Sequence, residues 1–257
     1  MSSRLEVSNF SPNNWEAYRE SRKNIFLCRR REQYWENLLV ADLRVDESFQ
    51  LDAFDYMIHD EELAAVILTR GLLENKTAGL PSTASETSYP EFRCKISVRL
   101  DNSISSYQGE MVTFPTGSAS SLFFDFMPQV AEQIDRYLVL LNFERSPLIR
   151  TGELIVSEVS LHSNEVKFVD NFEVLSNSVT VIPLNSLKAQ IAFDSCLMFN
   201  SNIGLIPYFV AHSREDEVLS FEHTHPPSSL VVLGNRFGVQ KTIKQSWLGS
   251  QSHKITR

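Results

Sequence analysis

Residues 93–100 read Arg93-Cys94-Lys95-Ile96-Ser97-Val98-Arg99-Leu100, and this alternation decides the fold class. The even-numbered positions are apolar and the odd-numbered positions are polar, which is the period of a half-buried β-strand. Further strands are predicted at residues 108–114, 122–127, 137–143, 153–161, 165–174, 179–184, 191–199, 203–211 and 218–225. About ten short strands with Asn, Ser, Gly and Pro between them, and no alternating helices, predict an antiparallel β-sandwich or a partly closed barrel.

The N-terminal part of the chain has a different spacing. Between residues 13 and 40, aromatic and aliphatic residues such as Trp15, Tyr18 and Ile25 recur at helical intervals, which predicts a surface helix. A second helix is predicted over residues 60–74. It begins with three acidic residues, which suit the positive end of a helix, and its apolar residues follow at steps of three and four.

These patterns divide the chain into four segments. Residues 1–75 are predicted to be helical, and residues 76–91, rich in Thr, Gly, Pro and Ser, to be a linker or a mobile loop. Residues 92–227 hold the predicted sandwich, and residues 228–257 a basic helix and tail. The apolar stripe of that helix, which we expect to pack on the sheet, comprises Leu230, Leu233, Phe237 and Trp247. The predicted fold class is therefore α+β, mainly β.

The composition of the chain limits the compartment and the classes of partner that we expect. Among the 257 residues, no apolar run approaches the ~20 residues that cross a bilayer, and Met1 to Val7 lack the apolar stretch of a signal peptide. Three widely spaced cysteines, Cys28, Cys94 and Cys196, fit a reducing compartment, so we expect a cytoplasmic protein. The net charge of −8 argues against general nucleic-acid binding.

A histidine pair, His223-Thr224-His225, is the feature of the sequence that most suggests chemistry. In a strand, this spacing places both imidazoles on one face and Glu222 on the other. If residues 214–217 form a four-residue hairpin loop, Tyr208 falls opposite His223. Tyr208 and Glu222 are therefore the candidate binding residues beside the pair.

The pair supports two hypotheses, a metal site or the structural end of a strand. A catalytic zinc site has three protein ligands, and Asp194 and Glu173 are unranked candidates for the third. His223-Thr224-His225-Pro226 resembles the start of the JAMM metalloprotease motif. The motif continues with a serine and a metal-binding aspartate, whereas this chain has Leu233 and Arg236 at the corresponding positions.

The leading expectation is a recognition or assembly protein that binds a protein partner or a second copy of itself, without a membrane or nucleic acid. The alternative is a metal-dependent hydrolase that uses His223 and His225, with a divalent metal such as zinc as cofactor.

Overall fold

The structure is a computed structural model. Its described strands pair with one another in antiparallel fashion. It describes residues 2–9, 22–52, 55–56, 63–81, 93–100, 103–109, 120–126, 133–160, 162–163, 165–187, 192, 194–213, 215–216 and 218–223. The strands are β1 Ser2–Ser8, β2 Lys23–Arg30, β3 Trp35–Leu43, β4 Ser48–Asp52, β5 Ala64–Thr69, β6 Lys76–Thr77, β7 Arg93–Leu100, β8 Ser103–Gly109, β9 Ser121–Asp125, β10 Ile134–Leu141, β11 Thr151–Ser160, β12 Val166–Leu175, β13 Val179–Pro183, β14 Ser195–Ser201, β15 Ile206–Ser213 and β16 Val218–His223. A short 3-10 helix, η2, spans Leu184–Ser186.

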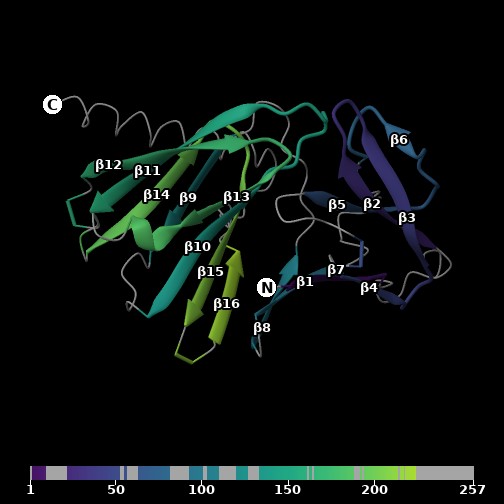
Figure 1. The fold of residues 1–257 in the computed structure, drawn as a ribbon, viewed down its shortest axis with the longest axis horizontal. Helices are drawn as coiled ribbons and strands as arrows, with labels where there is room; N and C mark the ends of the chain where they lie inside the picture. The colour runs from purple at the N-terminus through teal and green to yellow at the C-terminus, as the bar shows by residue number, and fades with distance from the viewer. Residues whose placement is uncertain are drawn as a thin grey trace, which may run out of the picture.

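The strands form four sheets of four strands each (Figure 1). Sheet A has the order β4-β1-β7-β8 and sheet B the order β5-β2-β3-β6, and together they make the N-terminal sandwich. Sheet C has the order β12-β11-β14-β9 and sheet D the order β13-β10-β15-β16, and together they make the C-terminal sandwich. The mainly β, antiparallel part of the predicted fold class is confirmed.

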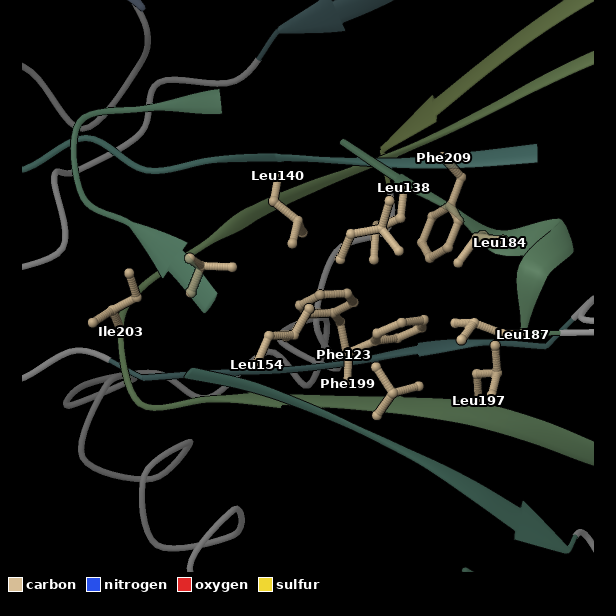
Figure 2. Packing of buried hydrophobic residues seen from close by; sticks show 13 residues of the cluster. Phe123, Leu138, Leu140, Leu154, Leu184, Leu187, Leu197, Phe199, Ile203 and Phe209 are labelled. Atoms are coloured by element: carbon tan, nitrogen blue, oxygen red, sulfur yellow. The ribbon is translucent and has the colours of Figure 1, made fainter. Parts of the chain in front are cut away.

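The largest core lies between sheets C and D. Figure 2 shows Leu138, Leu140 and Phe209 of sheet D facing the aromatic and aliphatic side chains of sheet C. Phe123 and Phe199 stack with their ring centroids 5.0 Å apart in the middle of this layer. Because alternate residues of each strand point to opposite faces, these inward side chains leave a second set facing outward. The outward sets supply the candidate sites.

Strand β2 of sheet B is buried on both of its faces. Ile25 packs toward sheet A, while the neighbouring Phe26 and Cys28 pack on the opposite face with Trp35. Phe143, from the loop after β10 in the C-terminal sandwich, lies against this second face. A strand covered on both sides reads as a continuous apolar run and loses its period of two.

The two helices predicted within residues 1–75 are wrong wherever the structure describes them. Residues 23–40 form β2 and most of β3, and residues 64–69 form β5. The apolar runs of β2 and β5 resemble helical periodicity because residues on both faces of these strands are buried. Residues 13–21 and 60–62, and the predicted C-terminal helix, lie outside the described residues.

Nine of the ten strands predicted from residue 93 onward are present, most within three residues of the predicted bounds. The strand predicted at residues 108–114 overlaps β8, Ser103–Gly109, only at residues 108 and 109, and residues 110–114 lie outside the described part. In the segment predicted as a linker, β6 pairs with β3 and Leu80 is buried, while residues 82–91 lie outside the described part. Strand β7 pairs with β1 and β8 pairs with β7, so both belong to sheet A, on the N-terminal side of the molecule.

Among the described residues, two groups of contacts join the two sandwiches. The first uses the carbonyl oxygen of Arg145, which accepts hydrogen bonds from Trp35 Nε1 at 3.1 Å and from the Leu80 N–H at 2.7 Å. The second lies where β7 and β8 approach sheet D: Val98 packs with Val210 and Leu219 in a shared cluster. Together these contacts set which part of sheet D the N-terminal sandwich covers.

Candidate functional site

The outward face of sheet D carries the candidate site, because the predicted binding residue Tyr208 and the predicted ligand His223 belong to it by register. Tyr208 lies directly opposite His223, and His212 opposite Leu219, as the predicted four-residue hairpin loop requires. The register part of the prediction is therefore confirmed. The side chain of His223, and all of His225, lie outside what the structure describes.

Cross-strand pairing arranges this face in apolar rows. One row runs from Val181 on β13 through Val139 and Tyr208 to His223 on β16. The next row runs through Pro183, Tyr137, Val210 and Phe221. Neighbouring side chains on one face of a sheet lie ~5 Å apart, so each row forms a continuous surface.

The β15–β16 side of this face is covered. Val210 and Leu219 are buried beneath Val98, and Phe221 is half-buried beside them. The Phe221 N–H, on the edge of β16 that faces away from β15, donates to Ser105 Oγ at 3.1 Å. We call the outward-facing residues Tyr208 and Val210 of β15, with Leu219 and Phe221 of β16, the covered half.

Tyr208 is buried within the covered half. Its ring stacks on Phe221 with centroids 5.0 Å apart and planes 6° from parallel. Glu222 points to the opposite face, is exposed, and accepts a hydrogen bond from Ser220 Oγ at 3.3 Å. The structure therefore places Tyr208 with His223 on one face and leaves Glu222 apart from them.

The β10–β13 side of the same face is open to solvent. Tyr137 is 37% exposed and Val181 56% exposed, Pro183 is exposed, and Val139 is half-buried between them. Strand β13 is an edge strand of sheet D, so nothing in that sheet extends beyond it. These four residues, Tyr137, Val139, Val181 and Pro183, are called the open half.

A third metal ligand does not appear beside His223 in the described part of the chain. The described residues contain no group of three or more His, Cys, Asp or Glu side chains that could hold a metal ion. The two carboxylates suggested from the sequence lie on the other sheet of the sandwich: Glu173 belongs to β12 and Asp194 precedes β14. Asp194 instead lies 4.0 Å from His162.

Sequence reasoning missed a buried ion pair at the far end of this sandwich. Arg136 donates to Asp125 through two hydrogen bonds of 2.8 and 2.9 Å, and both side chains are buried. The alternation of β9 places Asp125 on the inward face with Phe123, and a charge at an inward position is a signal that the sequence did contain. Glu158, also buried, accepts a hydrogen bond from the Ala192 N–H at 2.7 Å.

Burial also sets the state of the cysteines. Desolvation raises the pKa of Cys28 to about 12, and it raises the pKa of Cys94 and of Cys196 above the ordinary value. The charge of Asp125 raises the pKa of Cys196 further. Because the thiolate is the reactive form, none of these three thiols is activated as a nucleophile.

No protein-family model, curated protein or solved structure matches this chain. In the part of the chain that the structure describes, no helix is long and apolar enough to cross a membrane. Function must therefore be argued from the faces of the two sandwiches.

Proposed function

We propose that this chain is a recognition or assembly protein whose open half on sheet D binds the apolar surface of a protein. The observation that carries the proposal is the exposure of Tyr137 and Val181 at diagonal positions of two paired strands, on a sheet backed by the largest core. A contiguous exposed apolar patch with polar surroundings is typical of an interaction surface. Tyrosine is enriched among the residues that dominate binding energy.

The shape of the open half suits a protein more than a small molecule. A sheet face supplies a broad platform, whereas small ligands favour concave pockets that bury most of their surface. The next row beyond the open half pairs Asp135 with His212, both half-buried, which provides a polar border. An apolar centre with a polar rim is the usual anatomy of a protein interface.

The compartment and the charge agree with this proposal. Three free cysteines fit a reducing environment, and we place the protein in the cytoplasm. The net charge of −8 disfavours the phosphate backbone of nucleic acids as a partner. A second copy of the chain is the partner to test first, because two open halves can pair about a twofold axis as identical apolar patches.

Sedimentation velocity over a range of concentrations tests the assembly. We expect the wild type to associate and Val181→Arg to stay monomeric, because the new charge would be buried in the contact. Val218→Arg is the matched control: Val218 is equally exposed, at 56%, but lies outside the open half. A wild type that stays monomeric throughout, or equal loss in both variants, would refute assembly through this face.

A further inference from the structure

Strand β13 forms the edge of sheet D next to the open half. It spans Val179–Pro183 and pairs with β10 on one side, and within the described part of the chain no strand pairs with its other side. An edge strand presents a row of backbone N–H and C=O groups that can pair with a further strand. The register of sheet D determines which groups of β13 these are.

Two hydrogen bonds outside the ladder fix the orientation of β10. The Asn142 N–H donates to the carbonyl oxygen of Ser178 at 3.2 Å, and the Arg136 N–H donates to Asn185 Oδ1 at 2.9 Å. Both acceptors belong to residues that flank β13. The even-numbered residues of β10 therefore direct their backbone groups toward β13.

The backbone groups of β13 alternate accordingly, because hydrogen-bonded and non-hydrogen-bonded positions alternate along an antiparallel pair. Thr180 lies opposite Leu140, an even-numbered position, so its N–H and C=O face β10. The groups of Val179, Val181 and Pro183 point away from β10, toward the outer edge. Pro183, which has no N–H, lies at an outward position, where β10 requires no donor.

We propose that β13 pairs antiparallel with β13 of a second copy of the chain, about a twofold axis at Val181. Each Val181 N–H then donates to the Val181 carbonyl oxygen of the other copy. Each Val179 N–H donates to the Pro183 carbonyl oxygen of the other copy, so the missing N–H of proline leaves no donor unpaired. This proposal specifies how a second copy meets the open half, and it rests on the self-association proposed above.

The composition of β13 suits pairing with itself. Its residues, Val-Thr-Val-Ile-Pro, carry no charge, so no like charges meet across the axis. The neighbouring edge strand β12 has Lys167, Asp170 and Glu173 and an irregular register with β11, and charges and bulges are the usual protection of an edge. Twofold pairing uses the same edge in both copies, so the assembly closes as a dimer.

Pairing would also enlarge the proposed binding surface. Directly opposite residues of paired strands project to the same face of a sheet. Val181 of each copy, 56% exposed in the single chain, would therefore lie beside its counterpart on one face. The two open halves become one apolar surface on a sheet of twice as many strands.

Sedimentation velocity of Val181→Pro tests the pairing. Proline is tolerated at an edge position whose N–H faces outward, and here it removes both hydrogen bonds at the axis while keeping an apolar side chain. We expect the dissociation constant of the dimer to rise by about tenfold or more. The matched control, Val181→Thr, keeps the N–H and the β-branched shape and should associate like the wild type. Far-UV circular dichroism checks that both variants are folded.

The outcomes separate this inference from the proposed function. If Val181→Pro associates like the wild type while Val181→Arg stays monomeric, association uses the side chains of the open half and the strand pairing is refuted. A wild type that stays monomeric refutes the strand pairing and assembly through the open half together.

Disulfide trapping tests the register without weakening the contact. In Val181→Cys, the pairing places the two introduced thiols on residues with Cα atoms ~5.5 Å apart, within the range of a disulfide. Oxidised glutathione should then link two chains through position 181, as identified by peptide mass spectrometry. Pro183→Cys is the matched control on the same face, because its two thiols would lie ~14 Å apart and should not link. No link in Val181→Cys, or equal linking in both variants, would overturn the proposal.

Discussion

The buried ion pair between Asp125 and Arg136 allows a quantitative test of how the C-terminal sandwich is held together. Asp125 belongs to sheet C and Arg136 to sheet D, so the two hydrogen bonds of 2.8 and 2.9 Å cross the sandwich. The guanidinium also lies 5.9 Å from the centre of the Phe209 ring. Because both charges are shielded from water, each one helps to compensate the other.

Removing one partner should therefore be more harmful than removing both. We expect Asp125→Asn to lower the free energy of unfolding by about 3–5 kcal/mol, since it removes the negative charge that faces a buried guanidinium. Arg136→Met removes the positive charge that faces the buried carboxylate and should cost a similar amount. In the double variant, Asp125→Asn/Arg136→Met, neither charge remains, so we expect a coupling energy of about 2–3 kcal/mol relative to the sum of the single changes.

Urea unfolding monitored by circular dichroism measures the four free energies of this cycle. The matched control is the exposed pair of Arg22 and Asp42, at 3.0 Å, whose coupling should stay below about 1 kcal/mol and fall with added salt. If the costs of the Asp125 and Arg136 variants simply add, the pair is not a mutually compensated buried unit. The reasoning from burial would then be refuted.

Three further predictions follow from single positions. Gly152→Ala should cost about 1–3 kcal/mol, because the new Cβ would lie 2.7 Å from Ile203 Cγ1, whereas Gly71→Ala, with nothing within 4 Å, should leave the melting temperature nearly unchanged. Burial raises the pKa of Cys28 from 9.0 to about 12. Between pH 9 and 12, the free energy of unfolding of the wild type should therefore fall by up to about 1.4 kcal/mol per pH unit relative to that of Cys28→Ala, and parallel pH profiles of the two proteins would contradict this. His223→Gln should cost about 1 kcal/mol and leave metal content, by elemental analysis, unchanged; loss of a stoichiometric metal would instead establish His223 as a ligand.

The sequence predicted the C-terminal sandwich well because each of its strands has distinct inner and outer faces. In β11, Leu154 and Val156 are buried in the shared core, while Thr151 and Glu153 are exposed. The register of β15 and β16 could also be derived, since a hairpin loop of fixed length leaves one pairing consistent with both apolar faces.

The N-terminal sandwich could not be predicted in the same way. Ile25, Phe26 and Cys28 are buried on two different faces of sheet B, so the strand has no polar side from which its period could be recognised. A β-bulge between Ile25 and Phe26 shifts the pairing with β3 and disturbs the alternation further. The second face of sheet B is covered by Phe143, which is distant in sequence and invisible to a local pattern.

The candidate site was partly predictable for a related reason. Local spacing correctly placed Tyr208 opposite His223, but it could not show that Val98 would cover one half of that face and leave Tyr137 and Val181 exposed. This division depends on the second contact between the sandwiches, at β7 and β8, which joins segments more than one hundred residues apart.

The outward faces of sheets C and D present the same physical problem and differ in how it is solved. Each is a row of apolar side chains left over when the shared core is filled, and water disfavours both. On sheet D, the N-terminal sandwich covers the β15–β16 side and leaves Tyr137 and Val181 exposed, whereas on sheet C the side chains of Cys196 and Met198 are buried at the centre of the outward face. Exposed apolar side chains favour burial against a partner, and the sedimentation experiment tests whether the open half of sheet D is such a surface.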